Sequence, residues 1–287
     1  MIPRPAEPAI FKELFWDTEN RHRNLETRIH FEEVTINYGE VQATIAPSRG
    51  ALVSRLQIGD KQVLYLDRAT FEDPSKNVRG GIPVLFPYAG KLQNGTLKIS
   101  GTQMGQHGFG RNRPWEVRER KLWRVRLALM SEESDQAVYP FHFCAEQTCT
   151  ILPCGLEVEL CILNNGEQPM PVSPGWHPYF NCSGSEKGKV QSTVPGVDHS
   201  QFSNEREFDF GVVAPPNGRA NFRIPQLGSV SLSFSPEMRH LQFWSQPGKN
   251  FICVEPFTGP NNTINTDRRI DILPGQARTF WMKIELE

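Results

Sequence analysis

The feature of this sequence that most constrains its fold is the alternation of apolar and polar residues with a period of two. Between Leu156 and Ile162 every second residue is apolar, and the same alternation returns between Phe280 and Leu286. Successive side chains of a β-strand point to opposite faces of a sheet, so the pattern predicts strands that are packed on one face only.

Other segments share this extended character and are separated by turn-forming residues, since the chain holds 23 glycines and 23 prolines. We expect further strands at Arg28–Asn37, Val41–Ala46, Ala51–Ile58, Trp115–Arg120, Trp123–Met130, His142–Ile151, Gly228–Phe234, His240–Trp244 and Phe251–Val254. Only Ile10–Trp16 has the spacing of a short helix. Strands without helical crossovers predict an all-β fold of antiparallel sheets, a sandwich or a barrel, and disfavour a parallel α/β sheet.

The length of 287 residues allows two domains, but all-β domains of 200–250 residues are common. The sequence has no internal repeat, low-complexity segment or long linker. We therefore expect one domain over residues 1–287, with residues 1–27 as an N-terminal extension that includes a Pro3–Pro8 tail. Asp198–Arg206 is predicted to be a polar loop.

The charge balance argues against polyanionic partners. Lysine and arginine total 31 against 32 acidic residues, which gives a net charge of −1 and no strong field to attract nucleic acid. No apolar run approaches the ~18 residues of a membrane-spanning helix, and Met1–Pro5 does not begin a signal peptide. We predict a cytoplasmic protein with neither nucleic acid nor membrane as partner; the sequence leaves the oligomeric state open.

The six cysteines are too few for a disulfide scaffold and contain no Cys-x-x-Cys pair. Four of them cluster between Cys144 and Cys161, within segments that are predicted to be strands. We expect reduced thiols that pack as small apolar side chains rather than a metal site.

Glycine-rich sequence marks the first two of the segments that could carry chemistry. These are Arg79–Pro87 and Gln106–Asn112. Glycine permits close approach of the backbone and positive φ angles, which suits either tight packing or a ligand that contacts the main chain.

The next segment, Ser173–Phe180, places a histidine on a stiff backbone. Pro174-Gly175 suits the centre of a type II turn, and Pro178 restricts His177 to extended angles. A lone histidine is often structural, but its aromatic neighbours would suit the apolar face of a sugar. Both interpretations stay open from these residues alone.

The last segment, Phe251–Asn262, opens with four apolar residues and then presents Glu255 before a proline. A buried acid is costly unless it is paired or useful. It can be an ion-pair partner of an arginine, or a base whose pKa burial has raised toward neutral pH.

A sugar site gives these pieces a common chemistry. To interchange the α and β forms of an aldose, one group protonates the ring oxygen while another removes the proton of the anomeric hydroxyl. Histidine and glutamate suffice, because each exchanges a proton near neutral pH and the reverse step resets both. This chemistry needs no metal, nucleotide or other cofactor.

Four motifs in this order resemble the aldose 1-epimerase (galactose mutarotase-like) family: Arg79-Gly-Gly-Ile-Pro, His107-Gly-Phe-Gly-Arg, His177-Pro-Tyr-Phe and Val254-Glu255-Pro. The resemblance covers residues 31–286. It implies a β-supersandwich, in which large antiparallel sheets pack face to face and an open concave cleft binds a hexose.

The resemblance also implies roles for single residues. His177 corresponds to the family's general acid at the ring oxygen and Glu255 to its general base at the anomeric hydroxyl. His107 corresponds to a second histidine that hydrogen-bonds near the reacting centre, and Arg79 to an arginine that contacts sugar hydroxyls. Together they imply an isomerase that interconverts the anomers of a hexose.

One departure leaves the substrate open. His-Thr-Tyr-Phe is usual in the well-studied branches of the family, whereas Pro178 replaces the threonine here. The hexose-6-phosphate branch uses basic residues for its phosphate, and Arg79 and Arg111 occupy similar motif positions, with Lys91 as a further candidate. Each arginine can equally be part of a structural ion pair.

Two other classes of protein remain as alternatives. A non-catalytic carbohydrate-binding protein on the same scaffold would stack the rings of Trp176, Tyr179 and Phe257 on the sugar. Alternatively, His107, His177 and Glu255 have the composition of a two-histidine, one-glutamate zinc site, although no His-Glu-x-x-His helix is present.

Overall fold

The computed structural model describes residues 31–287, which form antiparallel sheets with a single α-helix, α1 (Arg68–Glu72). The all-β prediction is confirmed. The predicted extension at residues 1–27, its Pro3–Pro8 tail and the helix at Ile10–Trp16 lie outside the described residues. Within the described part of the chain, no helix has the length and apolar character needed to cross a bilayer.

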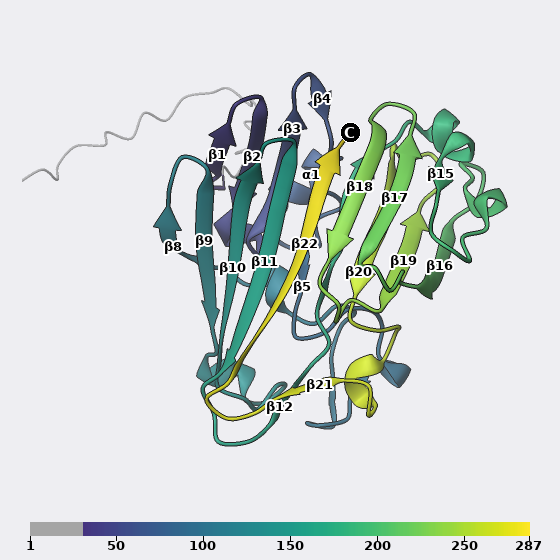
Figure 1. Cartoon of the computed structure of the whole chain (residues 1–287). Helices are drawn as coiled ribbons and strands as arrows, with labels where there is room; N and C mark the ends of the chain where they lie inside the picture. The colour runs from purple at the N-terminus through teal and green to yellow at the C-terminus, as the bar shows by residue number, and fades with distance from the viewer. Residues whose placement is uncertain (1–30) are drawn as a thin grey trace, which may run out of the picture.

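The largest sheet has eight strands and runs across the front of Figure 1. In spatial order they are β15 (Gln191–Ser192), β17 (Arg219–Ile224), β18 (Gly228–Phe234), β22 (Ala277–Leu286), β11 (Gly155–Asn164), β10 (Phe143–Leu152), β9 (Arg124–Met130) and β8 (Glu116–Arg120). Every neighbouring pair in this sheet is antiparallel.

A six-stranded sheet and a four-stranded sheet lie behind it in this view (Figure 1). The six-stranded sheet contains, in order, β16 (Phe208–Val213), β19 (His240–Ser245), β20 (Phe251–Phe257), β13 (Gly175–Trp176) and β5 (Val84–Leu85), and β14 (Tyr179–Asn181) also pairs with β20. The four-stranded sheet contains β1 (Val34–Tyr38), β2 (Val41–Ala46), β3 (Leu52–Ile58) and β4 (Lys61–Gln62).

Two small strand pairs complete the fold: β12 (Met170–Val172) with β21 (Ile270–Ile272), and β6 (Thr96–Leu97) with β7 (Thr102–Gln103). Short 3₁₀ helices connect several strands. They are η1 (Pro47–Arg49), η2 (Gln93–Gly95), η3 (Gly110–Asn112), η4 (Glu133–Asp135), η5 (Gly184–Lys189), η6 (His199–Gln201) and η7 (Thr263–Asn265).

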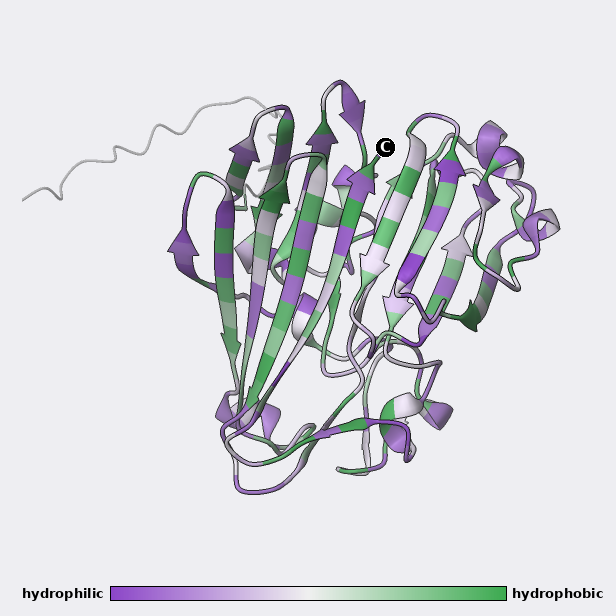
Figure 2. Ribbon diagram, viewed as in Figure 1, coloured by the Kyte–Doolittle hydropathy of each residue, from purple (hydrophilic) through white to green (hydrophobic). Residues whose placement is uncertain are grey.

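The apolar faces of the three large sheets meet in one continuous core. In β11, Leu156, Val158, Leu160 and Ile162 are fully buried, and the residues between them are partly exposed. Figure 2 shows this alternation as bands along β9, β10 and β11. Burying each such side chain contributes about 1.5–3 kcal/mol, so the period of two is the pattern that holds the sheets together.

The long strands agree closely with the sequence prediction. β2 and β18 have the predicted bounds, and β3, β8, β9, β10, β11 and β22 differ by a few residues at their ends. The described part of the strand predicted at Arg28–Asn37 is β1, which begins at Val34. The prediction missed α1, β16, β17 and all strands of two or three residues.

The six-stranded sheet is interrupted where the site forms. β14 pairs with the first half of β20, at Phe251–Cys253, whereas β13 pairs with its end, at Phe257. Pro178 lies in the gap on one side and Pro256 on the other. Proline has no backbone N–H to donate. These two positions therefore leave no N–H group without a partner where the pairing of the strands is interrupted.

Candidate active site

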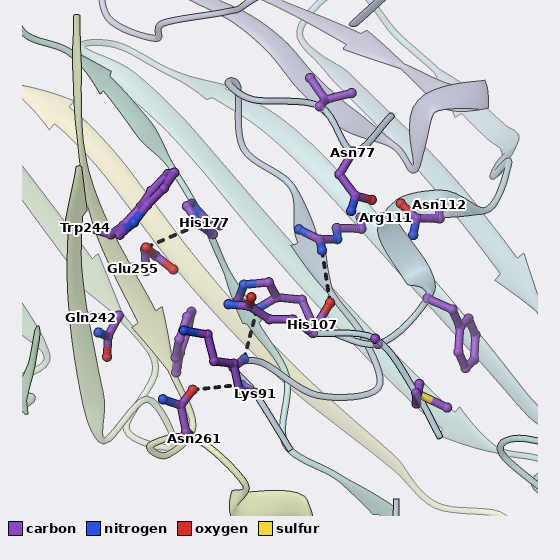
Figure 3. Close-up of a pocket in the computed structure, with 18 of the residues that line it drawn as sticks. Asn77, Lys91, His107, Arg111, Asn112, His177, Gln242, Trp244, Glu255 and Asn261 are labelled. Atoms are coloured by element: carbon purple, nitrogen blue, oxygen red, sulfur yellow. Dashed lines mark hydrogen bonds and ion pairs between the residues drawn. The ribbon is translucent and has the colours of Figure 1, made fainter. Parts of the chain in front are cut away.

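A cleft of about 590 Å³ opens on the side of the six-stranded sheet that faces away from the core. Residues of β16, β19 and β20 line it together with residues of several loops, among them Lys91, His107 and Arg111 (Figure 3). A cavity of this size accommodates a small-molecule ligand.

His177 and Glu255 meet on the floor of this cleft. The distance between His177 Nε2 and Glu255 Oε1 is 3.4 Å, and the two residues are only 6% and 2% exposed (Figure 3). Glu255 stands in the middle of β20, while His177 follows β13 directly at the interruption of the sheet. The His177 backbone N–H donates to the Pro83 carbonyl, which ties this segment to the β5 side.

Aromatic rings fix the orientation of the His177 imidazole. The Tyr179 ring stacks on it with centroids 4.6 Å apart and an angle of 12°, and Trp244 meets it edge-on at 5.6 Å. His177 Nδ1 is buried without a hydrogen-bond partner within residues 31–287. The ring is therefore held by packing, and Nε2 is the nitrogen that faces Glu255.

Burial shifts both titrating groups toward their neutral forms. It raises the pKa of Glu255 well above its ordinary value, with a further rise from Asp209. It also lowers the pKa of His177 well below its ordinary value, and the positive charge of Arg111 lowers it further. Between these two pKa values the pair holds one proton, which belongs to the pair rather than to either residue.

His107 presents a defined tautomer beside this pair. The Gly90 N–H donates to His107 Nδ1 at 2.9 Å, so the proton of the neutral ring is on Nε2. Burial lowers the pKa of His107 well below its ordinary value. The His107 and His177 ring centroids are 5.5 Å apart, and His107 thus offers a neutral N–H donor near the reacting pair.

Two arginines line the cleft, and neither forms an ion pair within residues 31–287. Arg111 donates from Nη2 to the Gln106 carbonyl at 3.0 Å, and Arg79 lies over the Trp244 ring at 5.3 Å. Arg111 Nε is buried without a hydrogen-bond partner in the described part of the chain, and both arginines line the cleft. The structural ion pairs left open by the sequence are absent from the described part of the chain.

Comparison with known proteins gives this arrangement a family. Residues 32–203 match the aldose 1-epimerase family, which is more than half of the chain. The chain belongs to the aldose 1-epimerase family. The crystal structure of a Synechocystis sp. PCC 6803 protein superposes on this chain with a TM-score of 0.85. The two sequences are 28% identical, and the match covers 93% of this chain and 99% of that one.

A galactose mutarotase-like protein from Lactobacillus casei ATCC 334 has the same fold as this chain, with a TM-score of 0.72. The two sequences are 21% identical, and the match covers 89% of this chain and 100% of that one. The predicted galactose mutarotase-like β-supersandwich is confirmed. A protein of Escherichia coli (strain K12) described as a "putative glucose-6-phosphate 1-epimerase" is 27% identical over 170 residues, covering 55% of this chain and 51% of that protein. The chain spans about half to three fifths of the length of such curated relatives.

The aromatic residues expected to stack on a sugar separate into three positions. Phe257 is among the residues that line the cleft. Trp176 does not, because it is fully buried in the core and its Nε1 donates to Gln147 on β10. Neighbouring residues of an extended chain point to opposite faces, so the chain that directs His177 into the cleft directs Trp176 away from it. Tyr179 is 2% exposed and lies behind the His177 ring.

One polar wall of the cleft carries no motif in the sequence. Asp209 on β16 and Gln242 and Trp244 on β19 line it, and Lys91 Nζ lies 3.5 Å from Asp209 Oδ2. Asn261 supports this side by accepting a hydrogen bond from the Lys91 backbone N–H (Figure 3). The pairing of β19 with β20, which places Gln242 opposite Glu255, was the signal that could have identified Gln242.

The donor atoms that could hold a metal ion differ from the triad suggested by sequence. Those of His177, Cys253 and Glu255 lie within 4.8 Å of one another, and His107 is not part of this group. Burial raises the pKa of the Cys253 thiol well above its ordinary value, whereas metal binding requires the thiolate. All six cysteines of the protein are free.

Proposed function

We propose that the protein is an aldose 1-epimerase that interconverts the α and β anomers of a hexose. The observation that carries this proposal is the 3.4 Å approach of His177 Nε2 to Glu255 Oε1 on the floor of an open cleft. An acid and a base so close together can reach the ring oxygen and the anomeric hydroxyl of one pyranose, since these two oxygens are bonded to the same carbon.

The reaction balances with the single proton of the pair. The pKa shifts favour the form of the pair with its proton on Glu255, and the reaction starts when this proton has moved to His177. The Glu255 carboxylate then takes the proton of the anomeric hydroxyl while His177 protonates the ring oxygen, and the bond from C1 to the ring oxygen breaks. The open-chain aldehyde then rotates about C1–C2. On ring closure from the other face, His177 takes back the proton of the former ring oxygen and Glu255 gives its proton to the new anomeric hydroxyl. This restores the starting state, so no net proton exchange with solvent is needed.

The surrounding groups orient the sugar and support the developing charge. His107 donates from Nε2 to an oxygen near the anomeric centre, and Arg79 and Arg111 donate to sugar hydroxyls. Because these groups are fixed before the sugar binds, little reorganisation is needed during the reaction.

The test is an anomerisation assay by polarimetry or NMR with glucose, galactose and glucose 6-phosphate. We expect acceleration over the spontaneous reaction for at least one of them. Sugar binding without any acceleration would instead identify a non-catalytic carbohydrate-binding protein on the same scaffold.

The second candidate is a hexose-6-phosphate 1-epimerase. Two observations favour it. Arg79 and Arg111 line the cleft and form no ion pair within the described residues, and the E. coli relative has a glucose-6-phosphate name. A strong preference for glucose 6-phosphate over glucose in the same assay would select this candidate. Equal rates for the two sugars would show that the phosphate is not required.

A further inference from the structure

A chain of polar contacts runs along the wall of the cleft and ends at a histidine outside it. Lys91 Nζ lies 3.5 Å from Asp209 Oδ2, and Gln242 Nε2 donates to Asp209 Oδ1 at 2.6 Å. The other side of the amide, Gln242 Oε1, lies 2.9 Å from His240 Nε2. His240 does not line the cleft, whereas the other three residues do.

The chemistry of these groups fixes the direction of each hydrogen bond. An ionised carboxylate only accepts, so the NH₂ group of Gln242 must face Asp209 and its carbonyl oxygen must face His240. His240 must then donate from Nε2. Without this donor, the amide of Gln242 loses the contact that opposes its rotation.

The backbone of β16 leaves space for this histidine. A Cβ atom at Gly211 would lie 2.1 Å from His240 Cε1 and 2.4 Å from its Nε2, far closer than real Cβ contacts. Gly211 is opposite Gln242 in the pairing of β16 with β19. The imidazole therefore lies over the one residue of this strand that has no side chain.

The opposite side of the imidazole is also packed. The His240 ring lies near the Phe257 ring, with centroids 6.1 Å apart and an angle of 28°. His240 is also opposite Phe257 in the pairing of β19 with β20. Gly211 and Phe257 thus restrict the imidazole to the position from which it reaches Gln242.

We infer that His240 is a positioning residue: it orients the Gln242 amide and, through it, the Asp209 carboxylate, so that this wall presents fixed hydrogen-bonding groups to the hydroxyls of the substrate. The inference rests on the proposed function. It predicts that the effect falls mainly on KM, because no hydrogen bond joins His240 to His177 or Glu255 within residues 31–287.

The test compares three variants with the wild type. His240→Phe retains a ring beside Phe257 but has no donor. Gly211→Ala removes no polar group, but its Cβ would meet both the imidazole and, at 2.8 Å, Gln242 Oε1, so it disturbs the contact between His240 and Gln242 from both sides. We expect both to raise KM about three- to tenfold, the range that one hydrogen bond typically contributes, with kcat within twofold. His240→Gln restores an N–H donor and should recover most of the lost affinity.

Gly188→Ala is the matched control, since a Cβ there meets only one atom, at an ordinary 3.6 Å. Its KM should equal that of the wild type. Circular dichroism establishes that each variant is folded, and Gly211→Ala tests the inference by itself if His240→Phe does not fold.

The outcomes separate the inference from the proposed function. If the wild type anomerises a hexose and folded His240→Phe and Gly211→Ala have its KM, the inference is wrong and the function stands. A fall in kcat at unchanged KM also overturns it. If the wild type neither binds nor anomerises any hexose, both proposals fail.

Discussion

The floor and the rim of the cleft differ in nearly every physical property. On the floor, His177, Glu255 and His107 are buried, held by strands or backbone contacts, and shifted toward their neutral forms. On the rim, Lys91 and Asp209 keep 59% and 43% of their side chains exposed and remain hydrated. Under the proposed function, proton transfer belongs to the floor and recognition of the sugar to the rim, so variants of the two regions should affect different kinetic constants.

The largest effect is expected on the floor. Glu255→Gln keeps the shape of the side chain but cannot accept a proton, and we expect kcat to fall by about 10²–10⁴-fold with little change in sugar affinity. Anomerisation followed by NMR gives the rate, and titration of the intrinsic tryptophan fluorescence, to which Trp244 in the cleft contributes, gives the affinity. A near-normal kcat would show that Glu255 is not the base.

The pH dependence tests the same region. On the acid side, kcat/KM falls when the pair of His177 and Glu255 takes up a second proton. Because burial lowers the pKa of His177, this fall is expected at a pH below the ordinary histidine pKa of about 6.5. Loss on the alkaline side requires removal of the only proton, and burial raises the pKa of Glu255.

We therefore expect a plateau of kcat/KM across neutral pH, measured by polarimetry with correction for the spontaneous reaction. An acid limb centred at or above pH 6.5 would contradict the shared-proton account. Glu255→Gln supplies the control, since its residual rate should lack the wild-type limbs.

Whether a strand of this fold can be predicted from the sequence depends on the length of that strand. Strands such as β11 and β22 repeat the alternation often enough to be recognised, whereas β5, β13 and β14 contain two or three residues and are defined by their partners in the sheet. The motifs around His107, His177 and Glu255 indicated three side chains that the fold brings together.

The remaining site residues have no local signal. Asp209 follows no motif. The strand that carries it, β16, was not recognised because it has only six residues and contains Gly211, a residue type that is uncommon in strands. Trp176 was misplaced for the converse reason: its neighbour His177 belongs to the cleft, but adjacent residues of an extended chain face opposite sides. Long-range pairing, not local sequence, decides such cases.

A smaller effect is expected on the rim. Arg79→Met retains the packing of a long side chain over Trp244 but removes the charge and the donors. We expect KM to rise about tenfold for the preferred sugar with kcat within threefold, measured by the same assay. Arg118→Met on β8, in the eight-stranded sheet, is the control and should leave KM unchanged. A fall in kcat alone for Arg79→Met would show that Arg79 takes part in the chemical step rather than in binding the sugar.

The smallest effect concerns metal ions. Because the pair transfers its proton directly and burial raises the pKa of the Cys253 thiol, we expect full activity after exhaustive treatment with a chelator. The measurement is kcat before and after chelation. Loss of activity that added zinc restores would assign His177, Cys253 and Glu255 to a metal instead.

The central claim is that His177 and Glu255 act on one sugar in one coupled proton transfer. A double-mutant cycle measured by NMR exchange between the two anomers tests it directly, with Glu255→Gln, His177→Asn and the combined variant. The account predicts that the combined variant is about as slow as the slower single variant. Losses in kcat that simply multiply would show that the two residues act independently and would contradict it.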